Sequence, residues 1–151
     1  MSQTKSAISS TSLGDAAVDG LLGGLGAGIA MLLFLLIAEF LGGVGPAMVL
    51  ARFDLGSTAS PLTGVLTHLA VASVYGLGFG ILWALTAVDK LPAGLTGTIY
   101  GFALFVLAET VMLPGTNSAL LAIPIWSLAL AHLVYGATLG WLVHRTGRHA
   151  R

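Results

Sequence analysis

The sequence contains no cysteine among its 151 residues. This absence excludes disulfide bonds, thiolate nucleophiles and any zinc or iron–sulfur site built on cysteine. Charge is also scarce, since Lys, Arg, Asp and Glu together make up only 8% of the chain. Because an average soluble domain carries roughly 25% charged residues, this chain cannot cover itself with a solvated surface. Its net charge of zero offers nothing to hold a nucleic acid, so we expect no nucleic-acid partner.

Apolar residues make up 56% of the chain and gather in four long segments. These segments cover residues 16–41, 61–88, 92–113 and 124–144. Each is as long as the roughly 20 helical residues that are needed to cross a lipid bilayer. A proline stands at the start of three of them, where its missing N–H is least harmful to a helix. The pattern predicts an all-α, multi-pass membrane protein with four transmembrane helices over residues 16–144.

The remaining segments predict how the chain is placed in the bilayer. Residues 1–15 are rich in Ser and Thr and are expected to form a flexible tail, and residues 145–151 a basic one. Residues 47–53 and 118–123 are short apolar stretches in the two longer connections, which we expect to be interfacial helices. With four spans, both termini lie on the same side. That side collects the cations Lys5, Lys90, Arg145, Arg148 and Arg151, whereas the other side has only Arg52. The positive-inside rule therefore predicts cytoplasmic termini in the inner (plasma) membrane.

The two halves of the chain resemble each other. LLFLLIAEF in the first half and FALFVLAET in the second each place an Ala-Glu pair near the end of a leading helix. Each half then continues with a proline, a histidine and the pattern Tyr-Gly-x-x-x-Gly, although the spacing from histidine to tyrosine differs. We therefore expect an internal repeat of two similar helical hairpins, related by an axis along the membrane normal.

Glycines recur at intervals of four within the predicted helices. The positions expected at helix contacts are Gly24, Gly28, Gly76, Gly80, Gly97, Gly101, Gly136 and Gly140. In lipid the hydrophobic effect does not press helices together, so close backbone approach at small residues does. The glycines predict a compact four-helix bundle or, alternatively, a face that docks a membrane-protein partner or a second copy of the chain.

Four ionisable residues lie inside the predicted spans: Glu39, His68, Glu109 and His132. Such groups are costly in lipid unless they face the bundle interior and find a partner. Three interpretations are open. In the first, each Glu pairs with the His of the next helix, or with main-chain groups left free near the prolines, to satisfy buried polar atoms. Alternatively, the repeat makes His68 and His132 the axial ligands of a haem b. In the third, the set binds a divalent metal ion or conducts protons or cations.

The segment AHLVYGATLGWLVHR, together with the glycine-rich GLLGGLGAGIAMLLFLL, resembles a family of small prokaryotic four-helix membrane proteins of unknown function. That family carries His-x-x-Tyr-Gly-x-x-x-Gly in its last helix, matched here by His132, Tyr135, Gly136 and Gly140. The resemblance covers most of residues 20–144. It implies the four-span fold and a prokaryotic inner membrane, but it implies no activity. The loop with Arg52 and the Ser/Thr-rich tail have no counterpart in it.

No group of side chains predicts catalysis, because Ser73 and Ser127 stand alone in apolar segments without a neighbouring base. We therefore expect a non-enzymatic accessory or scaffold subunit without a cofactor, which packs against other membrane helices. One alternative is a membrane protein of the outer leaflet that binds haem b through His68 and His132, or a metal ion through the Glu/His set. The other is a small proton or cation transporter.

Overall fold

The computed structural model describes residues 12–56, 59–86 and 91–149, and every regular element within these ranges is a helix. In chain order the elements are α1 (Leu13–Leu41), α2 (Pro46–Ala51), α3 (Pro61–Leu85), α4 (Ala93–Leu107), the π-helical turn η2 (Ala108–Met112), the 3-10 turn η3 (Ala119–Ala122) and α5 (Ile125–His149). Four helices are long and apolar enough to cross a membrane, with α4 and η2 counted as one. The predicted all-α fold with four candidate spans is confirmed.

Local sequence signals set where the helices start. The Ser12 hydroxyl accepts from the Asp15 amide while the Asp15 carboxylate accepts from the Ser12 amide, which is a capping box at the start of α1. α3 starts at Pro61, directly after the N-capping residue Ser60. The predicted tail of residues 1–15 is too long, because residues 13–15 already belong to α1. Residues 1–11 lie outside the described ranges.

The last helix is longer than the sequence pattern predicts. α5 continues to His149, so most of the expected basic tail at residues 145–151 is helical. The Arg145 guanidinium lies over the Trp141 ring, 4.0 Å from its centroid, and this cation–π contact stabilises the added turn. The predicted turn at Asp89 and Lys90 lies outside the described residues.

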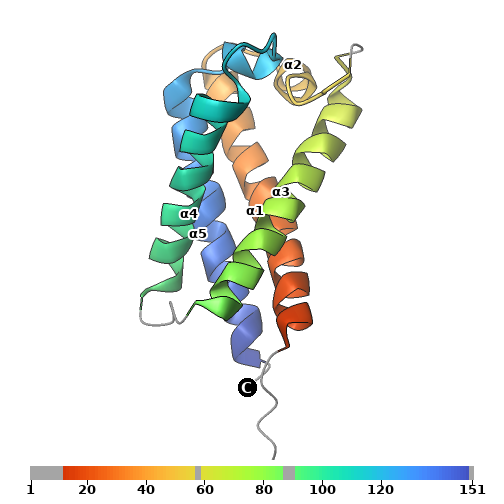
Figure 1. Cartoon of the computed structure of the whole chain (residues 1–151). Coiled ribbons are helices and arrows are strands. Elements are labelled where there is room, and N and C mark those ends of the chain that lie inside the picture. The colour runs from red at the N-terminus through yellow and green to blue at the C-terminus, as the bar shows by residue number, and fades with distance from the viewer. Residues whose placement is uncertain (1–11, 57–58, 87–90, 150–151) are drawn as a thin grey trace, which may run out of the picture.

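The connecting residues 42–56, 59–60 and 113–124 lie opposite the start of α1 and the end of α5, and we call this end of the molecule the loop end (Figure 1). They contain the short helix α2 and the turn η3, which overlap the interfacial helices expected at residues 47–53 and 118–123. The start of α1 and the described end of α5 thus lie at the same end of the molecule, as an even number of spans requires.

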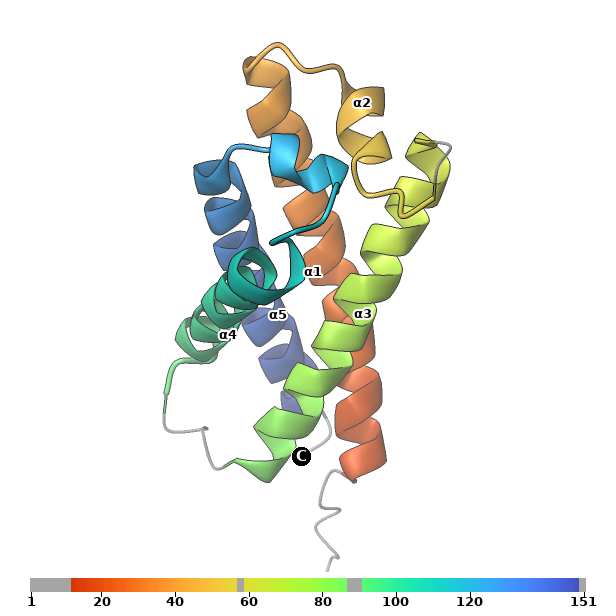
Figure 2. The ribbon, with the colours of Figure 1, turned by 45° about the horizontal axis from the view of Figure 1, so that its top comes forward.

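The four long helices contact one another in the order α3, α1, α5, α4. α1 packs against α3 on one side and α5 on the other, and α5 packs against α4. In the described part of the chain, α3 and α4 make no comparable contact, and they diverge toward the loop end (Figures 1 and 2). The fold is therefore two hairpins, α1–α3 and α4–α5, joined through α1 and α5.

Both hairpins pack through glycines. A Cβ placed on Gly24 would lie 2.8 Å from the Cα of Gly76, and one placed on Gly101 would lie 3.0 Å from the Cα of Gly136. Only glycine lets two helix backbones approach this closely. The glycines that meet one another in this way are Gly20, Gly24, Gly76, Gly80, Gly97, Gly101, Gly136 and Gly140. These contacts lie within the chain, so the stripes are already occupied by internal packing.

The glycine register shows which residues are equivalent in the two hairpins. Gly24 faces the carbonyl of Ala72 in α3, and Gly101 faces the carbonyl of His132 in α5. His132 therefore corresponds to Ala72, one helical turn away from the position that corresponds to His68. The prediction that the repeat relates the two histidines is wrong, because the different spacing from histidine to tyrosine shifts one of them by a turn.

Candidate functional site

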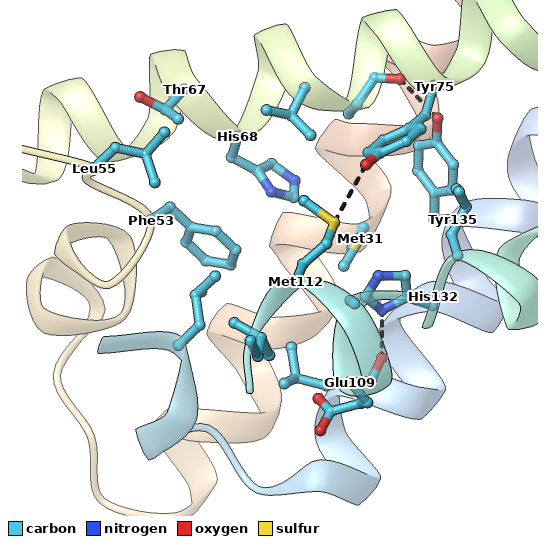
Figure 3. Close-up of a pocket in the computed structure, with 17 residues that line it drawn as sticks. Met31, Phe53, Leu55, Thr67, His68, Tyr75, Glu109, Met112, His132 and Tyr135 are labelled. Carbon is cyan, nitrogen blue, oxygen red and sulfur yellow. Dashed lines mark hydrogen bonds between the residues drawn. The ribbon is translucent and has the colours of Figure 1, made fainter. Parts of the chain in front are cut away.

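A cavity of about 230 Å³ lies between the two hairpins, in the half of the bundle near the loop end (Figure 3). All four long helices contribute to its wall, together with the segment after α2 and the turn η3. Most of the wall is apolar. Its polar or ionisable side chains are Thr67, His68, Tyr75, Glu109, His132 and Tyr135. Three of the four ionisable residues singled out in the sequence therefore meet at one cavity.

His68 reaches the cavity from the second turn of α3 and is buried. Its Nε2 lies 3.0 Å from the main-chain carbonyl oxygen of Gly28 in α1. Because a carbonyl oxygen only accepts, Nε2 carries the proton, and Nδ1 of the neutral ring keeps a lone pair. The Phe53 ring packs edge-on against the imidazole, with the centroids 4.7 Å apart. This contact and the hydrogen bond fix the orientation of the ring.

His132 reaches the same cavity from α5, on the other hairpin. Its Nδ1 lies 2.8 Å from the carbonyl oxygen of Leu128, one turn earlier in the helix. Nδ1 is therefore the protonated nitrogen, and Nε2 keeps the lone pair. The Phe105 ring packs on this imidazole, with the centroids 5.9 Å apart. Each histidine thus has one nitrogen bonded to the main chain and one nitrogen with an unused lone pair.

Two methionines lie between the two imidazoles in the view of Figure 3. Met31 comes from α1 and is buried, whereas Met112 is the last residue of the π-helical turn η2. The Tyr75 hydroxyl donates to the Met112 sulfur at 3.5 Å. The sequence carried no signal for Met112, because a π-helical turn alters the direction of the side chains that follow it. Such turns are frequent at functional sites.

Glu109 also belongs to η2, but its carboxylate points away from both imidazoles (Figure 3). Among the described residues it has neither a hydrogen bond nor a salt bridge. It borders a second cavity of about 280 Å³, whose other lining residues are 121–125 and Leu128. The hydrogen-bonded pair of Glu109 and His132 that the sequence suggested is not formed.

Glu39 lies away from the cavity and has a partner of its own. Its buried carboxylate, 5% exposed, accepts a hydrogen bond from the Arg52 guanidinium at 2.9 Å. Arg52 directly follows α2, so this ion pair ties the loop end to the last turn of α1. The pair of Glu39 and His68 that the first interpretation suggested is not formed either, because the Glu39 carboxylate is paired with Arg52.

Two tyrosine hydroxyls join the hairpins beside the cavity. Tyr135 of α5 donates to the carbonyl oxygen of Ala72 in α3 at 2.7 Å. Tyr100 of α4 donates to the carbonyl oxygen of Tyr75 in α3 at 2.8 Å. These bonds connect α3 to the second hairpin although α3 does not pack along α4.

The family of the chain follows from its match to known protein families. A model for a family of unknown function, DUF6789, matches residues 15–151. The chain belongs to the DUF6789 family. Neither a curated protein nor a solved structure matches it. Membership of DUF6789 brings no activity with it, so the function of this DUF6789 protein has to be argued from the cavity.

The cavity of this DUF6789 protein limits what can bind there. Its volume of about 230 Å³ is below the roughly 300–1,000 Å³ of pockets that hold drug-sized molecules, so it is too small to enclose a haem macrocycle. Within the described ranges, no group of three or more His, Cys, Asp or Glu side chains is placed to hold a metal ion. The predicted Glu/His metal set is therefore not assembled. Any ligands that join the two imidazoles must be of other residue types.

Proposed function

We propose that this DUF6789 protein is a membrane-embedded binding protein for one transition-metal ion, held in the cavity by His68 and His132. The observation that carries the proposal is the bonding of the two rings. In each ring one nitrogen donates to a main-chain carbonyl, and the other keeps a lone pair beside the same cavity. Metal-binding histidines almost always have this second bond, which fixes the tautomer and orients the ring. Imidazole suits zinc, copper, iron and nickel.

A purely structural role accounts for only one of the two nitrogens of each imidazole. The carbonyls of Gly28 and Leu128 satisfy the N–H of each ring but leave its acceptor nitrogen unused. Packing alone needs neither lone pair, yet the two histidines contribute one each from opposite hairpins of one cavity. A metal ion would use both lone pairs at once.

Metal retention by the full-length protein tests the proposal. The protein is purified in detergent through a tag without histidine, stripped with a chelator, and given one equivalent of Cu(I), Co(II), Ni(II) or Zn(II). It is then desalted and analysed for metal. We expect the wild type to keep one ion of at least one of these metals, and His68→Gln and His132→Gln each to lose it.

His144→Gln is the matched control for this experiment. His144 lies against Trp83 in the last third of α5, outside the cavity wall, so its replacement is expected to leave retention unchanged. The proposal fails if the wild type keeps no metal. It fails equally if both cavity variants keep as much metal as the wild type does.

A second candidate function is that of an accessory subunit packed against other membrane helices, and the exposure of α4 favours it. Only 11% of the most apolar part of α4 and η2 is buried within the chain, against 28–39% in the other spans. The glycine stripes do not favour it, because they are occupied within the chain. A photo-crosslinker at Ile99, exposed on α4, is expected to join one defined partner or a second copy in native membranes. Recovery of the uncrosslinked monomer alone would contradict this second function.

The orientation we propose follows the distribution of Lys and Arg. Both termini lie in the cytoplasm and the loop end faces outward from the inner (plasma) membrane. A reporter fused to the C-terminus that is active only in the cytoplasm is expected to be active. Activity of a periplasm-specific reporter at that position would reverse the orientation.

A further inference from the structure

We infer that the ion is Cu(I) and that the thioethers of Met31 and Met112 are its further ligands, an inference that rests on the proposed metal site. The two sulfur atoms reach the cavity from different hairpins, Met31 from α1 and Met112 from η2. Both lie between the rings of His68 and His132 in Figure 3. Met112 is half-exposed but lines the cavity, whereas Met48 on α2 does not line it.

The chemical types of the ligand atoms indicate which metal ion binds. Thioether sulfur is a soft ligand that favours Cu(I), and imidazole binds copper as well. Two imidazoles and two thioethers form a neutral set, so a monovalent ion leaves a smaller charge to bury in an apolar cavity than a divalent one does. Hard ions such as Mg²⁺ and Ca²⁺ need several oxygen ligands. Among the described lining residues only Glu109 carries a carboxylate, and it points away.

The surroundings of Met112 hold its sulfur toward the cavity. The Tyr75 hydroxyl donates to this sulfur at 3.5 Å and leaves a second sulfur lone pair for a metal ion. The direction of Met112 follows from the wide turn of η2, in which the Leu113 amide donates to the Ala108 carbonyl, five residues earlier, at 2.9 Å. π-helical turns are rare and are frequently found at functional sites. Its presence at the cavity fits a ligand that must be aimed inward.

Replacing the thioethers by leucine tests the inference. Leucine and methionine are close in volume, so Met31→Leu and Met112→Leu keep the packing of the cavity wall. Cu(I) affinity is measured without oxygen by competition with bicinchoninate, in the wild type, both single variants and the double variant. We expect each single variant to lose at least about tenfold in Cu(I) affinity, the loss that even changes outside the ligand shell cause. Met48→Leu is the control and is expected to behave as the wild type.

The outcomes separate this inference from the proposed function. If the wild type retains no metal of any kind, the metal site itself is refuted. If Cu(I) binds through the histidines but the double methionine variant binds it as tightly as the wild type, only the thioether ligands are refuted. X-ray absorption of the Cu(I)-loaded wild type decides the point without any variant. Sulfur scattering at the copper is expected, and a shell of nitrogen alone would overturn the inference.

Discussion

Replacing Gly24 by alanine tests the contact that holds α1 against α3. The added Cβ would lie 2.5 Å from the carbonyl oxygen of Ala72 and 2.8 Å from the Cα of Gly76. Both neighbours are backbone atoms, so neither can turn away as a side chain could. The helices must separate by about 0.9 Å before the nearest contact reaches the ordinary 3.4 Å. Overpacking costs about 1–3 kcal/mol, and the better helix propensity of alanine offsets up to about 1 kcal/mol. With the full offset, we expect a net loss of up to about 2 kcal/mol in the free energy of unfolding.

Gly94→Ala is the matched control, because a Cβ on Gly94 in the first turn of α4 meets nothing within 4 Å. This variant gains helix propensity without a clash, so its stability is expected to stay the same or rise by up to about 1 kcal/mol. Both variants are compared with the wild type by reversible unfolding in mixed detergent micelles with increasing dodecyl sulfate, followed by helical circular dichroism. The reasoning is refuted if Gly24→Ala is as stable as the wild type, or if the control loses as much.

Three further changes probe the polar contacts in the same unfolding assay. Arg52→Leu leaves the Glu39 carboxylate buried without its partner, so we expect a loss of about 3–5 kcal/mol in the free energy of unfolding. Adding Glu39→Gln to the same chain should restore much of this stability. Ser127 is fully buried, and its hydroxyl has no hydrogen-bond partner in the described structure, so Ser127→Ala should be neutral or stabilise by about 1–3 kcal/mol; a clear loss would reveal a partner. Tyr135→Phe removes the bond to the Ala72 carbonyl and should lower stability by about 0.5–1.5 kcal/mol; an unchanged midpoint would mean that the hydroxyl does not hold the hairpins together.

The helices of this protein were predictable because the requirements for a membrane-spanning helix are simple. A span must be long, apolar and closed on its own hydrogen bonds, and each of the four predicted segments meets that requirement. Glycine spacing likewise indicated which helix faces pack, since close backbone approach needs the absence of a side chain. The start of α1 could have been found more closely as well. Ser12 and Asp15 have the spacing of a capping box, which was a sufficient signal.

The arrangement of the polar groups could not be predicted in the same way. Hydropathy does not fix the rotation of one helix against another, so the repeat suggested equivalent histidines where the glycine register sets them one turn apart. The partner of Glu39 comes from a loop whose path depends on the whole fold. The π-helical turn at Ala108–Met112 leaves no recognisable trace in the sequence, yet it turns Met112 toward the cavity and the Glu109 carboxylate away from the histidines.

Metal binding by both cavity histidines is tested most directly by the nitrogen signals of the four imidazoles. A long-range ¹H–¹⁵N spectrum of histidine-labelled protein is recorded during titration with Ag(I), a diamagnetic stand-in for Cu(I). The hydrogen bonds to Gly28 and Leu128 predict that the ion shifts Nδ1 of His68 and Nε2 of His132 together, while the other nitrogen of each ring stays protonated. Shifts confined to His144 and His149, or a shift in only one of the two cavity rings, would contradict a site shared by the two hairpins.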